Sequence, residues 1–335
     1  MSSKLLGVFA FAALWLAAGP AVADCKPLSL VASVDLAPTD DLRPFVPVTL
    51  SGRPKLMLID TGGVATVLTQ QAADELGLKP TQGMLELSDI AGRKTSKLVH
   101  SPLTLGRLSA QNMSFYVLPD DHAIDEPNTA GIIAPDVLSN YDVEIDFGSR
   151  KFNLLSQDHC EGKVVYWPTE FVAIIPFLKM NSGHIQFKVM LDGKDVVADF
   201  DTGAYVTTLT RSVAVDDLGI TVGGADTPRV GSLTDSADAA VYTHVFKSLD
   251  LGGVAVSNLN VVIIPDMTRT VRRRAAAPPV GYRLSDKRGD EADQAMLLGM
   301  NILRHLHIYI AYNEQKIYIT AAGPPPAAPS PHATP

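Results

Sequence analysis

The chain lacks the residue patterns of several common classes of site. It has only two cysteines among 335 residues, and these cannot by themselves supply a zinc site of the usual four ligands. No His-Glu-x-x-His sequence occurs among its eight histidines, and no Gly-x-Ser-x-Gly elbow is present. The net charge of −8 argues against a nucleic-acid partner. We therefore expect no metal, no cofactor and no nucleic acid.

The first 23 residues follow the pattern of a secretory signal peptide. Lys4 supplies a positive start, residues 5–18 are apolar, and Ala21-Val22-Ala23 forms a small-residue cleavage site. The mature chain is predicted to begin at Asp24, and a retained N-terminal anchor is the alternative. The apolar run is too short to span a bilayer comfortably. We expect an exported protein, periplasmic or secreted, whose mature form is not in the membrane.

Export bears on how the two cysteines are interpreted. An even number of cysteines in an oxidising compartment favours a disulfide, here between Cys25 and Cys160. The bond would tie the mature N-terminus to the end of the first half of the chain. Two buried free thiols are the alternative.

The tripeptide Asp-Thr-Gly occurs twice, each time at the end of an apolar run. Asp60-Thr61-Gly62 follows residues 56–59, and Asp201-Thr202-Gly203 follows residues 196–200. A given tripeptide is expected at roughly one position in several thousand at average residue usage. Two copies in matched settings therefore indicate a repeat that delivers two carboxylates in the same way.

The sequences around the two tripeptides also match. Each copy is preceded by an alternating run and a glycine turn, which is typical of a hairpin, and each continues as D-T-G-x-x-x-T-x-L-T. Short helices are predicted at residues 70–76 and 211–218, ending at Gly77 and Gly219. Residues 131–138 parallel 296–303, and each leads into a further hairpin. Period-two alternation with short turns predicts an all-β fold.

The repeat divides the mature chain into two lobes. We predict an N-terminal lobe of residues 24–160, a C-terminal lobe of residues 161–322 and a disordered Pro/Ala-rich tail of residues 323–335. The second half is longer, and the excess falls at residues 268–294, which read as a surface loop of undetermined role. Asp142 is interpreted as an outward strand residue and His307 as a surface residue.

With these motifs, the chain resembles the aspartic proteases, and in particular the bacterial retropepsin-like proteins with two fused retroviral-type domains. The resemblance implies a bilobal pepsin/retropepsin-like fold, with two pseudo-symmetric β-barrel-like lobes and a cleft between them. It implies that Asp60 and Asp201 form the catalytic pair. Thr61 and Thr202 would hydrogen-bond across to the opposite loop, while Gly62 and Gly203 would allow the tight turns. Residues 88–98 and, less clearly, 230–242 are the candidate flaps.

Three positions depart from the family pattern. Gly63 stands where the family usually has Ala or Ser, Ala134 stands where it has Gly, and Asn301 replaces an aspartate. The extra methyl of Ala134 is expected to push on the Asp60 loop if the packing there requires glycine. Neither Gly63 nor Ala204 offers a hydroxyl to the carboxylate pair, so a mildly acidic pH optimum is expected.

The sequence thus predicts an exported aspartic endopeptidase, active as a monomer on polypeptide substrates through a water activated by two aspartates. A catalytically silent bilobal module that binds peptides or a partner protein in the cell envelope is the alternative, and Gly63 and Ala134 give it weight. An interaction scaffold in the envelope is a third possibility. The identity of the peptide substrate does not follow from the chain.

Overall fold

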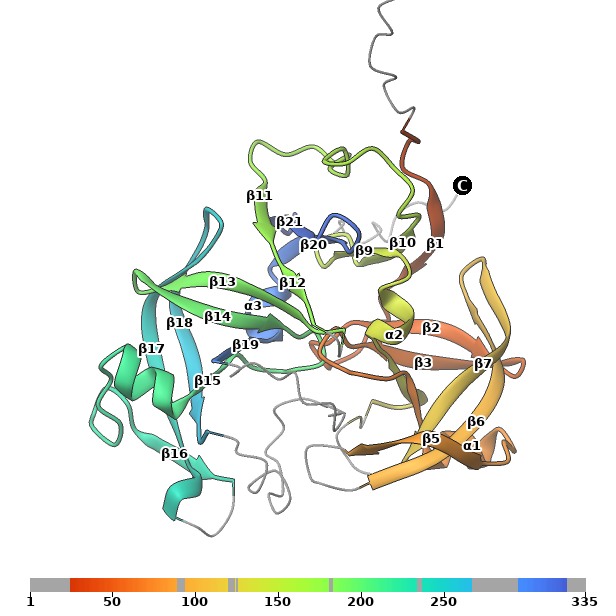
Figure 1. The fold of residues 1–335 in the computed structure, drawn as a ribbon, viewed down its shortest axis with the longest axis horizontal. Helices are drawn as coiled ribbons and strands as arrows, with labels where there is room; N and C mark the ends of the chain where they lie inside the picture. The colour runs from red at the N-terminus through yellow and green to blue at the C-terminus, as the bar shows by residue number, and fades with distance from the viewer. Residues whose placement is uncertain are drawn as a thin grey trace, which may run out of the picture.

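The computed structural model describes residues 25–88, 94–119, 124, 126–180, 183–233, 237–266 and 295–323. The predicted signal peptide, the tips of both candidate flaps, the 268–294 loop and the tail beyond Gly323 lie outside these described residues. Strands dominate the described part, and they form three sheets (Figure 1). Within that part, no helix is long and apolar enough to cross a membrane.

The first half of the chain builds a seven-stranded sheet. Its strand order is β2-β3-β8-β4-β7-β6-β5, and the strand that ends at the first Asp-Thr-Gly lies between β2 and β8. The strands are β2 (Phe45–Leu50), β3 (Arg53–Ile59), β4 (Val67–Thr69), β5 (Thr81–Ser88), β6 (Lys94–Leu105), β7 (Leu108–Leu118) and β8 (Thr129–Ile133).

The second half builds an eight-stranded sheet whose arrangement corresponds to that of the first. Its order is β12-β13-β14-β19-β15-β18-β17-β16, so the strand before the second Asp-Thr-Gly also lies between a hairpin partner and a parallel strand. The strands are β12 (Leu178–Lys179), β13 (Ile185–Leu191), β14 (Lys194–Phe200), β15 (Thr208–Thr210), β16 (Arg229–Ser232), β17 (Ala240–Leu251), β18 (Val254–Ile264) and β19 (Met296–Leu298).

A third sheet of six strands joins the two halves. Its order is β1-β10-β9-β20-β21-β11, so β9 of the first half pairs directly with β20 of the second. In Figure 1 this sheet lies above and between the two lobes. Its strands are β1 (Leu30–Asp35), β9 (Asp142–Asp146), β10 (Lys151–Leu155), β11 (Ala173–Pro176), β20 (Leu306–Ala311) and β21 (Lys316–Ala321).

The all-β, bilobal fold predicted from the repeat is confirmed. The helical elements are short: α1 (Gln70–Glu75), α2 (Pro135–Leu138), α3 (Met300–Leu303), the π-helix η2 (Val213–Asp217) and the 3-10 helix η3 (Ala237–Ala239). The division into lobes at residues 160 and 161 stays a prediction, because strands of both halves share the third sheet.

The two hairpins that lead to the Asp-Thr-Gly loops have the same turn. Ser51 and Gly52 have φ of 47° and 77°, and Asp192 and Gly193 have φ of 48° and 78°. Positive φ at both central residues matches the turn to the twist of the flanking strands. The registers Leu50↔Arg53 and Leu191↔Lys194 follow directly from these two-residue turns.

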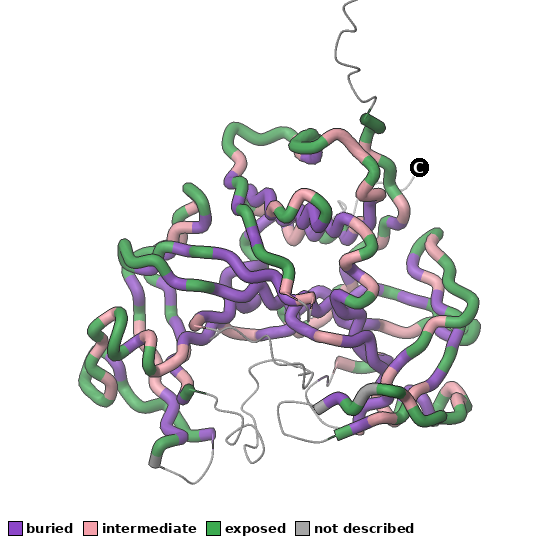
Figure 2. Tube along the Cα trace, viewed as in Figure 1, coloured by how far each residue is buried: buried purple, intermediate pink, exposed green. Residues whose placement is uncertain are grey.

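Apolar burial fixes where each Asp-carrying strand ends. Met57, Leu58 and Ile59 are fully buried in β3, and Ala198 and Phe200 are equally buried in β14. Buried residues run along the strands through the centre of the molecule, and exposed residues collect at the outer turns (Figure 2). The end of each strand is paired with a parallel neighbour, and the loop that follows starts from a rigid position.

The joint sheet overturns two expectations about the surface. Asp142 is fully buried and His307 is only 7% exposed, because the β9–β20 pairing places them inside a continuous sheet. His159 Nε2 lies 2.6 Å from Asp142 Oδ2, and His307 Nε2 hydrogen-bonds Glu144 Oε1 at 2.8 Å. Trp167 stacks on the His307 ring with centroids 3.9 Å apart. No local pattern in the sequence predicts the burial of Asp142 and His307, because each is buried by the other half of the chain.

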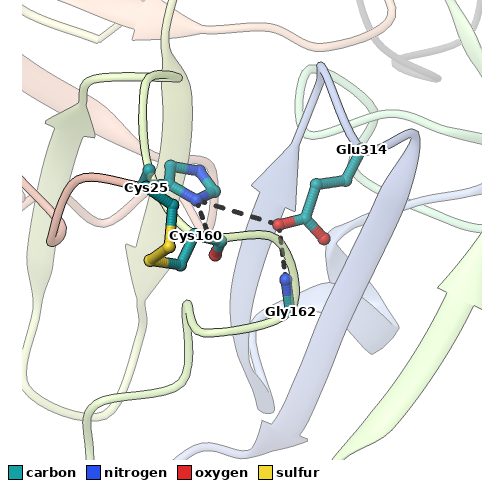
Figure 3. The surroundings of a disulfide bond; sticks show 5 residues. Cys25, Cys160, Gly162 and Glu314 are labelled. Atoms are coloured by element: carbon teal, nitrogen blue, oxygen red, sulfur yellow. Dashed lines mark hydrogen bonds and ion pairs between the residues drawn. A yellow bond between two sulfur atoms is a disulfide. The ribbon is translucent and has the colours of Figure 1, made fainter. Parts of the chain in front are cut away.

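Cys25 and Cys160 form a disulfide in the structure (Figure 3). The Cys160 backbone N–H donates to Lys26 O at 3.0 Å, so the bridged segments also pair through the backbone. Two residues on, Gly162 N–H donates to Glu314 Oε1 at 2.9 Å, in the turn between β20 and β21. The disulfide therefore fixes the start of the described chain to the segment that connects the two halves.

Candidate active site

The structure brings the two Asp-Thr-Gly loops face to face. Each aspartate directly follows its strand: Asp60 N–H donates to Ile133 O at 3.0 Å, and Asp201 N–H donates to Leu298 O at 3.1 Å. Asp60 is fully buried and Asp201 is 2% exposed. In each half, the aspartate N–H is hydrogen-bonded to the end of the parallel neighbouring strand, β8 or β19. The two aspartates therefore occupy equivalent places in the two halves.

The glycine of each Asp-Thr-Gly motif lies against the aspartate of the other motif. A Cβ added at Gly62 would lie 2.3 Å from Asp201 Cγ, and one added at Gly203 would lie 2.5 Å from Asp60 Cγ. Neither glycine has a positive φ. Glycine is therefore required here for space at the meeting of the loops, in addition to the turn expected from the sequence.

The same glycines also bind the carboxylates of their own loops. Gly62 N–H donates to Asp60 Oδ1 at 2.9 Å, and Gly203 N–H donates to Asp201 Oδ1 at 2.8 Å. These bonds fix the rotation of each carboxyl group. A backbone N–H that points at a carboxylate favours its charged form.

The two threonines hydrogen-bond across the meeting of the loops. Thr61 Oγ1 donates to Phe200 O at 2.9 Å, and Thr202 Oγ1 donates to Ile59 O at 2.7 Å. In return, Thr61 N–H donates to Thr202 Oγ1 at 3.2 Å and Thr202 N–H donates to Thr61 Oγ1 at 3.1 Å. All four groups are buried, so each bond replaces water that the folded chain excludes. This exchange holds the two aspartates at a fixed separation.

Burial and proximity change the acidity of the pair. Burial raises the pKa of Asp60 well above its usual range, and the charge of the facing Asp201 carboxyl raises that pKa further. The Gly62 N–H and the positive charge of Arg43 act in the opposite direction on the pKa. Two close carboxyl groups cannot both ionise freely, so this arrangement retains one proton over a range of pH where isolated aspartates are charged.

A second layer of hydrogen bonds supports each loop. Thr66 N–H and Oγ1 donate to the Asp136 carboxylate at 2.9 and 2.7 Å, and Ala134 N–H donates to Thr66 Oγ1 at 3.0 Å. The D-T-G-x-x-x-T pattern gave the signal for Thr66, but no local pattern predicts its bond to Asp136, which lies in the first turn of α2.

The second half repeats this support with an amide. Thr207 N–H and Oγ1 both donate to Asn301 Oδ1 at 2.8 Å, and Gly299 N–H donates to Thr207 Oγ1 at 3.1 Å. Asn301 is a working substitute for an aspartate here because only acceptor oxygens are needed. Its Nδ2 donates in addition to Asn260 O at 3.2 Å.

Both candidate flaps are antiparallel hairpins in the described residues. β5 pairs with β6, with Ser88 opposite Lys94, and β16 pairs with β17, with Ser232 opposite Ala240. Both hairpins lie along the lower side of the view in Figure 1. Their action as flaps stays a prediction, since the tips are outside the described residues. The part of the chain that the structure describes contains no group of three or more His, Cys, Asp or Glu side chains suited to a metal ion.

Comparison with known proteins agrees with this geometry. A family model described as aspartyl protease matches residues 46–136 and 187–302, which together make up more than half of the chain, and each matched segment contains one Asp-Thr-Gly. A search of curated proteins finds no match. Among solved structures, the aspartic proteinase from Irpex lacteus is similar over 87% of this chain and 97% of its own, at 15% identity and a TM-score of 0.48. On the strength of the two family-model matches, this chain belongs to the aspartyl protease family.

Proposed function

We propose that the protein is an exported aspartic endopeptidase that hydrolyses peptide bonds with a water activated by Asp60 and Asp201. The family implies a polypeptide substrate. The observation that carries the proposal is the mutual contact of the loops, in which each glycine abuts the opposite carboxyl group. Two buried carboxyl groups held in this way form an acid–base pair without a metal.

The chemistry follows from the single proton that such a pair keeps. The ionised carboxylate removes a proton from a water molecule lying between the two groups, and the oxygen of that water attacks the peptide carbonyl carbon. The protonated carboxyl donates its proton to the carbonyl oxygen. Collapse of the tetrahedral intermediate breaks the C–N bond: the departing amine takes a proton from the pair, and a hydroxyl of the intermediate returns its proton to the pair as the carbonyl forms again. No covalent enzyme intermediate is needed.

The positions that gave weight to a silent fold are explained by the packing. A Cβ added at Gly63 would lie 3.2 Å from the Ala134 Cβ and 3.3 Å from Asp60 Oδ2. The methyl of Ala134 therefore occupies space that the missing side chain of Gly63 leaves. The loop of Asp60 keeps the same hydrogen bonds as that of Asp201, which favours an active pair.

Export and a monomeric state complete the proposal. The Cys25–Cys160 disulfide supports export because such bonds persist in oxidising compartments. One chain supplies both aspartates, so no second copy is needed to complete the site. N-terminal sequencing of the exported protein is expected to begin at Asp24, and sedimentation is expected to give the mass of one chain.

The test of catalysis is cleavage of a peptide library at several pH values by wild type, Asp60→Asn and Asp201→Asn. Each substitution removes one member of the pair, and each is expected to lower the rate by several orders of magnitude. Asp74→Asn is the matched control, because this exposed helix residue carries the same change away from the site. Pepstatin should inhibit the wild type. Cleavage that survives either active-site substitution would contradict the proposal.

A further inference from the structure

A histidine next to the disulfide lies between two carboxyl groups that come from different halves of the chain. His159 follows β10, and its side chain is only 3% exposed. Its Nε2 lies 2.6 Å from Asp142 Oδ2 in β9, and its Nδ1 lies 3.8 Å from Glu314 Oε1 in the turn between β20 and β21. Both carboxyl groups are buried as well. The imidazole therefore separates two buried carboxyl groups at the joint of the two halves.

Both ring nitrogens of His159 face oxygen acceptors. Nδ1 lies 3.1 Å from the carbonyl oxygen of Cys160, and Nε2 lies against the Asp142 carboxyl group. A neutral imidazole has one N–H and can donate to one of these oxygens, whereas the imidazolium donates to both. Asp142 also accepts the Tyr309 hydroxyl at 3.1 Å and the Tyr312 N–H at 3.2 Å, and three donors favour its charged form. The geometry therefore fits an imidazolium beside a carboxylate.

Hydrogen bonds hold the Glu314 carboxyl group beside the imidazole (Figure 3). Gly162 N–H donates to Glu314 Oε1 at 2.9 Å, and the Tyr318 hydroxyl donates to Oε2. Lys316 Nζ lies 3.7 Å from the same Oε2 and 2.7 Å from Glu161 Oε1. One oxygen of Glu314 thus faces the imidazole, and the other faces a tyrosine and a partly exposed lysine.

The groups around His159 favour its protonated form. Burial by itself lowers the pKa of His159. The hydrogen bond and charge of Asp142 outweigh burial, together with the Cys160 carbonyl and the charge of Glu314, and they raise this pKa above its usual value. Burial also raises the pKa of Asp142, against the bond and charge of His159. Both groups therefore bind their protons more tightly in the folded chain than in the unfolded chain.

The other titratable groups nearby do not replace His159 in this role. Burial raises the pKa of Tyr309, Tyr312 and Tyr318, so these phenols stay neutral from acid to neutral pH. His307 is also part of the joint, and it bonds Glu144. Charged groups at the surface nearby are paired, Lys26 with Asp158 and Lys316 with Glu161.

Loss of the His159 proton would change the joint in two ways. One ring nitrogen would turn a lone pair toward an oxygen atom, and that buried acceptor would lose its donor. The Asp142 and Glu314 carboxylates, one from each half, would then face each other across a neutral ring, and like charges in a buried place repel. Deprotonation therefore weakens the contact between the halves at this point.

We propose that His159 is a proton-dependent latch between the two halves of the chain. In its imidazolium form it holds Asp142 of the first half and Glu314 of the second half together. In its neutral form it loosens the turn between β20 and β21, which these carboxylates help to fix. The latch does not involve Asp60 or Asp201, so it can be tested whether or not the protein cleaves peptides.

The pH range of the latch follows from the direction of the pKa shift. The pKa of His159 is raised in the folded chain, so protonation stabilises the fold. This contribution is fully present below the usual value of 6.5 and is lost as the pH rises through the folded pKa. The raised pKa of Asp142 acts with the same sign at lower pH, because its ionisation costs stability as the pH rises from its usual value.

The first measurement is an NMR titration of the histidine rings in the full chain labelled with 15N. Through-bond correlations assign the His159 signals. Both ring nitrogens are expected to be protonated below the transition, and the transition is expected above the usual value of 6.5. Glu314→Gln removes one of the two carboxylates and should move the transition to lower pH. A wild-type transition at or below the usual value would overturn the proposal.

A double-mutant cycle measured as a function of pH separates the latch from simple packing. Urea unfolding is followed for wild type, His159→Gln, Glu314→Gln and the double variant. The coupling between the two positions is expected to be favourable below pH 6.5 and to be lost as the pH passes the His159 transition. His100→Gln is the matched control, because this exposed histidine bonds Ser114 away from the joint. A coupling that is zero or does not change with pH would overturn the latch.

Amide hydrogen exchange tests the loosening itself in the unmodified protein. The backbone N–H groups of Gly162 and Tyr312 bond the Glu314 and Asp142 carboxylates, so both amides report on the latch. After correction for the intrinsic exchange rate, both are expected to lose protection as the pH rises through the His159 transition. Protection that stays constant across this transition would contradict the proposal.

A control amide and a second variant keep these results decisive. Ser248 N–H bonds the Asp192 carboxylate away from the joint, and it is expected to show no loss of protection in the same pH range. A loss at Ser248 equal to that at the joint would indicate general loosening and would overturn the latch. If His159→Gln does not fold, the wild-type exchange and the titrations of wild type and Glu314→Gln decide the question.

Discussion

Gly63 and Ala134 lie directly against one another beside the first aspartate, with room for one methyl group between them. A second methyl at Gly63 would come within 3.2 Å of the Ala134 Cβ. In the other half the methyl stands on Ala204, and Gly299 has no room for one, because a Cβ there would lie 2.5 Å from the Val206 carbonyl. The two halves have exchanged the position of a single methyl group.

The exchange predicts how substitutions at this contact combine. Gly63→Ala crowds Asp60 and is expected to lower kcat/KM by roughly tenfold, since small displacements of a catalytic group are costly. Ala134→Gly leaves a small cavity and adds backbone freedom, at a cost of about 1–2 kcal/mol in the free energy of unfolding. The double variant reproduces the arrangement of the second half and should recover most of both losses. Peptide cleavage and urea unfolding measure the two effects, and additive losses in the double variant would refute the exchange.

The difference in stability between Asp136→Asn and wild type is expected to depend on pH. Burial raises the pKa of Asp136 above its usual value, so the folded chain binds this proton more tightly than the unfolded chain does. Ionisation therefore costs stability as the pH rises from the usual pKa through the folded one. Asparagine cannot ionise, and Asn301 shows that an amide oxygen accepts both threonine bonds. Thermal unfolding from acid to neutral pH should show that the stability of Asp136→Asn relative to wild type increases as the pH rises. A difference that stays constant with pH would contradict the expectation.

The pH optimum of cleavage is expected to be mildly acidic. Gly63 and Ala204 follow the two motifs and offer no hydroxyl to the ionised pair, and burial together with Asp201 raises the pKa of Asp60. A second proton then binds the pair at higher pH than in enzymes whose pair accepts such a hydroxyl bond. The rate as a function of pH checks this, and a maximum near about pH 2 would reject the explanation.

Loss of the disulfide is expected to lower the stability of the molecule and to leave Asp60 and Asp201 in place. Cys25 and Cys160 are 135 residues apart in sequence, and removing such a bond costs about 2–5 kcal/mol. Cys25→Ser/Cys160→Ser should therefore unfold at lower denaturant than wild type, with its cleavage profile retained at low temperature. Reducing agent should lower wild type to the level of the double variant and leave that variant unchanged. Equal stability of both proteins would show that the bond contributes nothing.

Local sequence patterns were sufficient for much of the fold and for the central residues of the candidate site. The hairpins before Asp60 and Asp201 follow from alternation and turn glycines, and the short helix predicted at residues 70–76 is observed at Gln70–Glu75. These signals act over a few neighbouring residues. The bond between Asp136 and Thr66 could not be predicted, because the two residues lie 70 positions apart in the chain. A repeat reveals which residues correspond, and it does not reveal which of them touch.

The sequence by itself determined where each carboxyl group stands at the end of a buried strand, because period-two burial and turn geometry are local properties. Only the tertiary structure decided that the two glycines share space with the opposite aspartates, that β9 pairs with β20 around Asp142, and that Arg43 reaches the loop of the other half. These contacts join residues that are more than a hundred positions apart. They depend on how two packed halves meet, which no short stretch of sequence specifies.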